Sequence, residues 1–160
     1  MKIESLVVED WESVKEIYQQ GIDSGLATFE QETPNWHNWH EKHLPYARLV
    51  AKDGQQVVGW AALTPYSNRE VYKGVAEISI YILNGYQGTG IGSILLSNLI
   101  IESEKHGIWT LQASIFPQNH ASLSLHKKHG FRQVGIREKI AKHVDGWRDV
   151  ILLERRKKDE

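Results

Sequence analysis

The sequence predicts a mixed α/β fold in which a central mixed β-sheet is flanked by helices. Residues 75–83 are apolar and often β-branched at almost every position, which is typical of a strand buried on both faces. A helical pattern follows this strand, and a second apolar strand is predicted at 109–116. Two parallel strands joined through a helix form a right-handed crossover. The middle of the chain therefore predicts the centre of the sheet.

The first 25 residues predict a strand and a helix. Residues 2–8 alternate loosely in polarity, as a strand does. Asp10 is a favourable N-cap for the helix, which should end near Gly21 or Gly25. Its apolar face consists of Trp11, Val14, Ile17 and Tyr18.

A short second helix and a hairpin are predicted next. The helix should have Pro34 in its first turn and end before Pro45. Asp53-Gly54 is a strong turn signal between two apolar runs, which predicts a hairpin of strands at 48–52 and 55–63.

The second half of the chain continues this alternation. The helix after the central strand should end at Gly107 and bury Ile91, Ile94, Leu95 and Leu99. A further helix and two strands are expected at 119–129, 134–140 and 147–153, before a charged tail at 154–160. No linker or repeat interrupts the sequence, so residues 1–160 are expected to form a single domain.

Charge and composition exclude several function classes. Lys and Arg number 19 against 20 Asp and Glu, so the net charge of −1 offers no basic surface for nucleic acid. The chain has no cysteine, which excludes disulfides, thiol catalysis and cysteine-ligated metals. No apolar run is long enough for a signal or a membrane span. We expect a cytoplasmic protein with neither nucleic acid nor a membrane as its partner.

A glycine-rich turn at 87–92 lies between the central strand and the next helix. Free backbone N–H groups and the helix dipole make such a turn suitable for a phosphate or pyrophosphate, although a tight structural turn is the alternative. A Walker loop would need Lys after the glycines, where Ser93-Ile94 stand instead. A Rossmann fingerprint would need an acid after the next strand, which ends at Phe116-Pro117. The turn thus fits neither nucleotide class.

These residues resemble the GNAT superfamily of acetyl-CoA-dependent N-acetyltransferases. Its Gln/Arg-x-x-Gly-x-Gly/Ala signature is similar to Gln87, Gly90 and Gly92. A second element of that family resembles Asn119, Ser122, His126 and Gly130-Phe131. The order and spacing of the two elements make the resemblance more specific than either alone.

Four further segments resemble the phosphinothricin acetyltransferase-like branch of this superfamily: Ala27–Glu30, Arg69-x-x-Tyr72, Glu77 and Trp147-x-Asp149-Val150. The branch acetylates the amino group of small amino acids and their analogues, and it implies a homodimer. The segment from Lys142 to Trp147 is one residue longer than is usual in the branch, and we expect it to border the acceptor pocket.

The resemblance implies roles for individual residues. Glu77, an acid inside an apolar strand, is the expected general base, with a purely structural carboxylate as the alternative. His126 is either the acid that protonates the departing thiolate or only a cofactor contact, and the sequence leaves both open. The expected acetyl-CoA contacts are Ile80, Tyr81, Ile82, Gln87, Gly88, Thr89, Gly90, Ile91, Gly92, Ser93, Asn119, Ser122 and His126. The expected acceptor contacts are Phe29, Glu30, Arg69, Tyr72 and Glu77, with Arg69 and Tyr72 holding a carboxylate.

The expected reaction is direct transfer of acetyl from acetyl-CoA to the amino group of a small amino-acid-like acceptor, of the phosphinothricin or methionine sulfone or sulfoximine type. Other amines, such as a polyamine, an aminoglycoside or a protein N-terminus, remain open, as does a non-catalytic acyl-CoA-binding module. No metal site is expected. His37, His40 and His43 lack an acid that would complete a zinc set, and we expect a solvated helix face there.

Overall fold

The computed structural model describes residues 1–158, and its sheet has seven strands in the order β1-β2-β3-β4-β5-β7-β6. The strands are β1 (Lys2–Ser5), β2 (Leu49–Asp53), β3 (Gln56–Pro65), β4 (Val75–Ile82), β5 (Thr110–Ile115), β6 (Arg132–His143) and β7 (Gly146–Arg156). The helices are α1 (Trp11–Ser24), α2 (Trp36–Lys42), α3 (Ile91–Lys105) and α4 (His120–Lys128), with short 3-10 turns η1 (Val8–Asp10) and η2 (Glu70–Tyr72). The predicted mixed α/β fold is confirmed.

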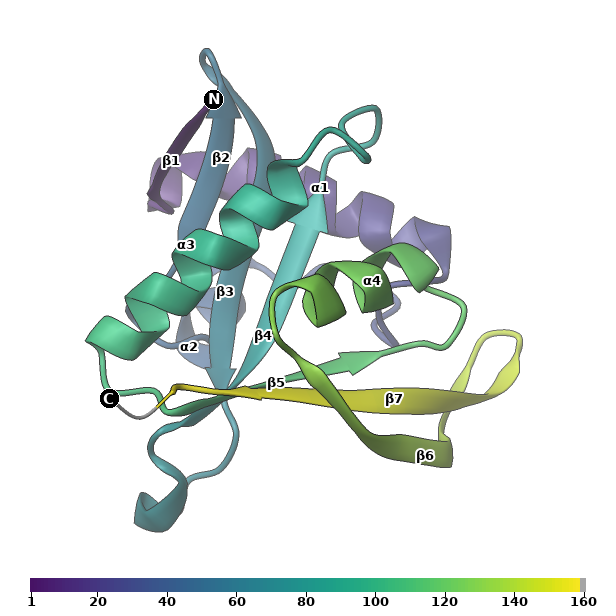
Figure 1. Cartoon of the computed structure of the whole chain (residues 1–160). Helices are drawn as coiled ribbons and strands as arrows, with labels where there is room; N and C mark the ends of the chain where they lie inside the picture. The colour runs from purple at the N-terminus through teal and green to yellow at the C-terminus, as the bar shows by residue number, and fades with distance from the viewer. Residues whose placement is uncertain (159–160) are drawn as a thin grey trace.

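The strand at the centre of the sheet is β4, as the sequence predicts (Figure 1). It pairs with β3 in antiparallel fashion and with β5 in parallel, while all other neighbours are antiparallel. The chain passes from β4 to β5 through α3, which confirms the predicted crossover.

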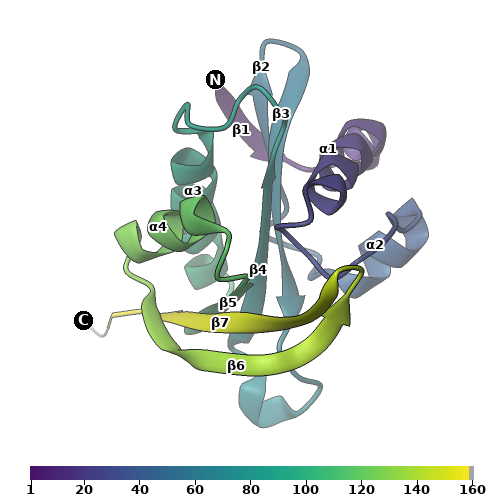
Figure 2. The ribbon, with the colours of Figure 1, turned by 90° about the vertical axis from the view of Figure 1, so that its right-hand side faces the viewer.

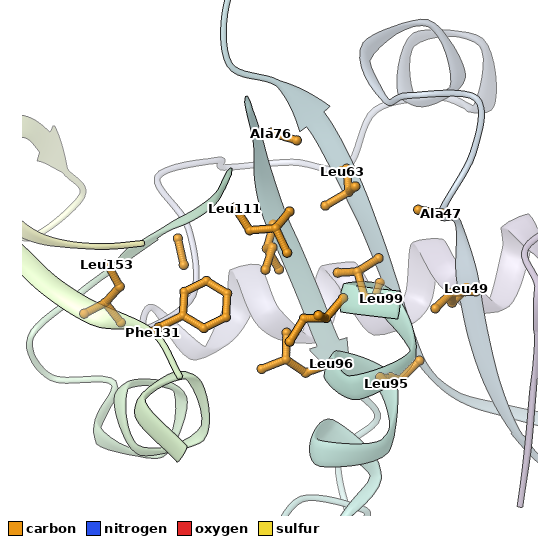
Figure 3. Close-up of a cluster of buried hydrophobic side chains, with 14 of the residues drawn as sticks. Ala47, Leu49, Leu63, Ala76, Leu95, Leu96, Leu99, Leu111, Phe131 and Leu153 are labelled. Carbon is orange, nitrogen blue, oxygen red and sulfur yellow. The ribbon is translucent and has the colours of Figure 1, made fainter. Parts of the chain in front are cut away.

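Helices cover both faces of the sheet, and Figure 2 shows α1 and α2 on one side and α3 and α4 on the other. On the α3 side, Leu95, Leu96 and Leu99 pack against strand residues such as Leu63 and Leu111 (Figure 3). The predicted face of this helix was wrong at one position. Ile94 is 42% exposed, and Leu96 is buried in its place.

Aromatic residues form the core on the α1 side. It includes Trp11, Tyr18, Trp39 and Trp60, all buried. The ring centroids of Trp39 and Trp60 lie 5.6 Å apart with the planes near perpendicular, an arrangement that aromatic pairs favour. This core joins α1 and α2 to β3.

The prediction that the central strand is buried on both faces was wrong. Ala76 and Ile78, which share the face toward α3, are buried, whereas the other residues of the strand are half-buried. The reason is the neighbouring strand, because β5 pairs only with the first three residues of β4, up to Glu77.

Asp10 is the N-cap residue of α1, as predicted, but its carboxylate accepts the Val7 N–H at 3.0 Å and makes no capping bond to the helix within the described residues. The predicted start of the second helix was wrong in detail. In α2, Asn35 is the N-cap and its side chain accepts the Asn38 N–H at 2.8 Å, so Pro34 precedes the helix.

The predicted charged tail starts too early at 154, since β7 continues to Arg156. The Glu154 carboxylate pairs with Arg132 of β6 and with Arg156. Residues 159–160 of that tail lie outside the described residues. Between residues 1 and 158, none of the helices has the length and apolar character needed to cross a membrane.

Candidate active site

A cavity of about 300 Å³ lies where β4 and β5 diverge. The two strands pair only as far as Glu77 and Gln112, after which β5 continues alongside β7. The residues that line the cavity are Tyr18, Ala27, Thr28, Phe29, Glu30, Lys42, Thr64, Glu77, Ile78, Ser79, Ile80, Tyr81, Ala113, Ser114, Ile115, Phe116, Asn119, Ser122, His126 and Val150.

The cavity is bordered by residues that face both sides of the sheet. Successive side chains of a strand point to opposite faces, and Tyr81 packs on the α1 side while Ile80 packs on the α3 side. Glu77 has the same parity as Tyr81 and therefore faces the α1 side. Residues of both parities line the cavity, so side chains from both faces of the sheet border it.

The side chain of Glu77 is half-buried, and two polar residues of β5 hold it in place. Its Oε1 accepts a hydrogen bond from Gln112 Nε2 at 2.8 Å and another from Ser114 Oγ at 3.1 Å. Both bonds reach the same oxygen, so Oε2 has no hydrogen-bond partner within the described chain. The carboxylate is thus oriented, with one oxygen left for a ligand.

Sequence reasoning missed Gln112 and Ser114. They share one face of β5 and alternate with the apolar Leu111 and Ala113. Polar residues at alternate positions of an otherwise apolar central strand were the signal that would have identified them.

His126 lines the same cavity from α4 and is 2% exposed. Its Nδ1 lies 2.7 Å from the Ser122 carbonyl oxygen, which accepts only, so Nδ1 carries the proton in the neutral ring. Nε2 is buried and has no partner in the described part of the chain. Burial lowers the pKa of His126, with a smaller contribution from nearby His129 and against the hydrogen bond to Ser122. The ring is therefore neutral at pH 7, with the lone pair of Nε2 available.

Asn119 and Ser122 also line the cavity, at the start of α4. Asn119 Oδ1 accepts the Ser122 N–H at 3.2 Å and caps the helix. Asn119 Nδ2 donates to the Leu26 carbonyl oxygen at 3.2 Å. The Asn119 amide thus connects α4 to the segment that follows α1.

Phe29 and Phe116 form an aromatic part of the cavity wall, with ring centroids 4.9 Å apart and planes at 88°. The guanidinium of Arg148 lies 4.7 Å from the Phe116 centroid and donates to the Gly25 carbonyl oxygen at 2.7 Å. The ring of His143 lies 6.1 Å from Phe116. The segment from 142 to 147 was expected to border the pocket, but its residues are not among those that line the cavity.

Two phenols and an acid complete the α1 side of the cavity. Burial, assisted by the charge of Glu30, raises the pKa of Tyr18 to about 12 and raises that of Tyr81 as well. Tyr81 stacks on Trp60 with centroids 4.9 Å apart. The Tyr81 side chain therefore lies on the α1 side of the cavity, and only its backbone remains for the predicted cofactor contact.

The glycine-rich turn lies at the C-terminal end of β4, outside the cavity wall (Figure 1). Gly88 and Gly90 have φ of 77° and 88°, which favours glycine, and the space where a Cβ would lie is open at both. Gly90 is the N-cap of α3. The backbone N–H groups in the first turn of that helix therefore have no partner within the helix. Such a turn can accommodate an anionic group.

Side chains within this turn are engaged with the protein itself. Gln87 Nε2 donates to the Ile82 carbonyl at 3.2 Å, and the Thr89 hydroxyl donates to the Tyr86 carbonyl. Ser93 Oγ lies 2.8 Å from His129 Nε2. The side chain of Ile91 is in the core at 2% exposure, so backbone groups are what the turn presents.

The structure does not bring Arg69 and Tyr72 to the cavity. Both are exposed in the β3–β4 connection, at the end of β4 opposite to the glycine-rich turn (Figure 1). The Arg69 guanidinium lies 5.4 Å from the ring of Tyr72. The cation in the cavity wall is Lys42, which sequence reasoning missed because its position depends on how α2 packs.

The expectation of a solvated histidine face on α2 was wrong for His43. Its ring is buried, stacks on Trp39 with centroids 4.1 Å apart, and places Nδ1 2.7 Å from the Trp39 carbonyl oxygen. Burial lowers the pKa of His43 to about 4. Residues 1–158 contain no group of three His, Asp or Glu side chains arranged to hold a metal.

Comparison with known proteins identifies the family. The model of the acetyltransferase (GNAT) family matches residues 10–131, more than half of the chain. The chain belongs to this family. Membership confirms the predicted enzyme class, an acetyl-CoA-dependent N-acetyltransferase.

Relatives of this GNAT enzyme align over nearly their whole length. Phosphinothricin N-acetyltransferase of Streptomyces coelicolor is 31% identical over 157 residues, which cover 93% of this chain and 92% of the relative. An L-methionine sulfoximine/L-methionine sulfone acetyltransferase of Salmonella typhimurium is 28% identical over 150 residues, 91% of this chain and 88% of the relative. The crystal structure of a GNAT phosphinothricin acetyltransferase from Sinorhizobium meliloti in complex with acetyl-CoA superposes with a TM-score of 0.89, at 28% identity, over 97% of this chain and 87% of that one.

Proposed function

We propose that this GNAT enzyme acetylates the α-amino group of a small amino-acid-like acceptor, of the phosphinothricin or methionine sulfone or sulfoximine type. The observation that carries the proposal is the cavity at the opening between β4 and β5, with Glu77 in its wall. Its volume of about 300 Å³ is at the small end for ligand sites and suits a molecule of amino-acid size. The names of the two relatives above support the same acceptor class.

Glu77 is the proposed general base. The attacking amine must lose a proton, and Oε2 of Glu77 is the oxygen left to accept it, directly or through a water. As the C–N bond forms, the proton passes from nitrogen to the carboxylate. The C–S bond of the thioester then breaks, and the thiolate takes up a proton from solvent water to leave as a thiol. No covalent enzyme intermediate is needed.

The α3 side of the opening is the proposed place for acetyl-CoA, which supplies the thioester carbon for attack. Beyond Glu77, β4 has no partner on its β5 side among residues 1–158, so the peptide groups around Ile80 and Ile82 are available to pair with the amides of the pantetheine arm. The backbone N–H groups from Gly88 to Gly92 would bind the pyrophosphate at the N-terminus of α3.

The structure supports the cofactor-contact role of His126 over the acid role. A neutral ring with its proton on Nδ1 has no proton on Nε2 to give to a thiolate. Nε2 is instead a buried acceptor without a partner, and such atoms are costly unless a ligand donates to them. We assign to it a hydrogen bond from an N–H group of acetyl-CoA.

We also propose a homodimer, as the family resemblance implies. The β6–β7 hairpin extends from the body of the molecule (Figure 1), and β6 is an edge strand. Large apolar side chains are exposed on this hairpin, namely Val134, Ile136, Ile140, Val144 and Trp147. A second copy that covers them would remove an exposed apolar edge. Light scattering during size-exclusion chromatography at several concentrations tests this, and a monomer throughout would contradict it.

The test of the proposed function is thiol release from acetyl-CoA with a panel of amines. The chain has no cysteine, so a thiol reagent reports only released CoA. Methionine sulfone, methionine sulfoximine and phosphinothricin should be acetylated at the amino group, as mass spectrometry would show. Turnover of a polyamine, an aminoglycoside or a peptide N-terminus, with none of these amino acids, would contradict the proposed acceptor class.

A further inference from the structure

We propose that Lys42 binds the carboxylate of the acceptor and so selects amino acids over amines that lack a carboxylate. This inference deepens the proposed function and rests on it. The sequence had indicated Arg69 for this task, but Arg69 is not part of the cavity wall.

The charges around the cavity are unevenly distributed. Two acids, Glu30 and Glu77, line it together with Lys42. His126 is neutral at pH 7, so Lys42 is the cation of the wall as far as the described residues show. A zwitterionic acceptor needs a negative partner for its ammonium group and a positive partner for its carboxylate. Lys42 supplies the positive charge, which the two acids cannot.

The backbone of Lys42 is fixed close to Glu77. Lys42 is the last residue of α2, and two residues later the Leu44 N–H donates to the Leu63 carbonyl at 2.8 Å. Leu63 precedes Thr64, which is paired with Glu77 across β3 and β4. Thr64 has the same parity as the paired Glu77, so it too faces the α1 side. The end of α2 therefore meets the sheet beside the proposed base.

Arg48 locks this end of α2 in place. Its guanidinium donates to the carbonyl oxygens of Leu44 at 2.6 Å, His40 at 2.8 Å and His43 at 3.0 Å. These bonds satisfy carbonyls that the end of the helix leaves unpaired, so Lys42 is not required for that purpose. Lys42 itself makes no ion pair within residues 1–158, and it is exposed and lines the cavity.

An amino-acid acceptor carries its ammonium and carboxylate groups on the same carbon, so Glu77 and Lys42 would bind it together. The α-ammonium group would be directed to Glu77 and the α-carboxylate to Lys42, which orients the amine toward the opening in the sheet. An ammonium on a flexible stem binds a carboxylate as a point charge and tolerates acceptors of different side chain. An amine without the carboxylate would leave Lys42 unpaired and would lose this orientation.

The experiment compares methionine sulfone with its carboxamide, which keeps the amine and removes the negative charge. In Lys42→Met, we expect kcat/KM for methionine sulfone to fall about 10- to 100-fold, as loss of a charge-assisted contact does. For the carboxamide, kcat/KM should change less than about threefold, and KM for acetyl-CoA should be unchanged. Lys42→Arg, which keeps the charge, should recover most of the preference for the acid.

Two matched variants serve as controls. Lys15→Met removes an exposed lysine of α1 that lies outside the cavity and should leave both acceptors unaffected. Arg69→Met tests the rival assignment and should preserve the preference for the acid. Loss of that preference in Arg69→Met but not in Lys42→Met would overturn the proposal, as would equal losses for the two acceptors in Lys42→Met.

A binding measurement separates this proposal from the proposed function. Calorimetric titration of methionine sulfone into protein saturated with CoA should show weaker binding for Lys42→Met than for wild type, with equal melting temperatures. Absence of thiol release together with this binding difference would contradict the proposed reaction and keep the role of Lys42. No binding of methionine sulfone to the wild type would overturn both.

Discussion

Glu77 and Gln112 form the last register pair between the parallel strands β4 and β5, and the Gln112 amide donates to the Glu77 carboxylate at 2.8 Å. The opening in the sheet thus begins at the residue that sequence reasoning selected as the base. A carboxylate at this point is held by the paired part of the sheet and exposed to the unpaired part. The same interruption of pairing leaves the backbone of β4 free to bind a second ligand.

The first prediction concerns Glu77 itself. Glu77→Gln keeps the size of the side chain and its contacts with Gln112 and Ser114 but cannot accept the proton of the amine. Loss of a positioned general base lowers rates by about 100-fold or more, so we expect kcat with methionine sulfone to fall by that factor at pH 7. Raising the pH, which deprotonates the free amine, should recover part of the loss. Steady-state kinetics between pH 7 and pH 10 measures both effects.

Ser114→Ala is the matched control for this prediction. It removes one hydrogen bond to Glu77 Oε1 and leaves the bond from Gln112. The expected loss in kcat is about tenfold or less, because the carboxylate keeps its position. Near-normal turnover of Glu77→Gln at all pH values would instead identify Glu77 as a structural acid.

The second prediction separates the two roles of His126. If Nε2 accepts a hydrogen bond from acetyl-CoA, His126→Phe should raise KM for acetyl-CoA about tenfold and change kcat less than about threefold. His120→Phe, at an exposed position of the same helix, should leave both constants unchanged. A fall of kcat by 100-fold or more with unchanged KM would assign the acid role to His126.

The third prediction is a pH dependence of stability that originates in α2. Burial lowers the pKa of His43 to about 4 from an ordinary value near 6.5, so between these values the unfolded chain binds a proton that the folded chain does not. This contribution to stability is complete above about pH 6.5 and is lost as the pH falls toward 4. The free energy of unfolding should therefore decrease by up to about 3 kcal/mol over this window on account of His43.

Urea denaturation at pH 7 and at pH 4.5 tests this in the wild type and in two variants. His43→Phe keeps the stack on Trp39 and removes the titrating group, so its dependence on pH should be distinctly weaker. His37→Phe removes an exposed histidine of the same helix and should titrate as the wild type does. Identical slopes in His43→Phe and wild type would contradict the prediction.

The extent to which sequence predicted the molecule differs between fold and site. The central strand, the crossover through 91–105 and the hairpin at Asp53-Gly54 follow from local patterns that the chain carries in itself. The position of Glu77 followed in the same way. Lys42 and Arg69 are different, because membership of the cavity wall depends on how α2 and the β3–β4 connection pack, and periodicity contains no such information. Likewise, nothing local predicts that β5 leaves β4 after three pairs.

The last prediction concerns Gly21, which lies inside α1 where alanine would favour the helix. An ideal Cβ at this position would lie 2.4 Å from the ring of Tyr81, which is stacked on Trp60 and lines the cavity. Alanine gains up to about 1 kcal/mol of helix propensity over glycine, whereas overpacking a core costs about 1–3 kcal/mol. Because the ring is held on both sides, by Tyr18 as well as Trp60, we expect the steric cost to exceed the gain. Gly21→Ala should therefore lower the melting temperature and raise KM for the acceptor.

Gly135→Ala, where a Cβ meets nothing within 4 Å, should do neither. A melting temperature raised in Gly21→Ala would show that α1 moves away from the sheet at little cost, and the acceptor side of the cavity would then be adaptable rather than rigid.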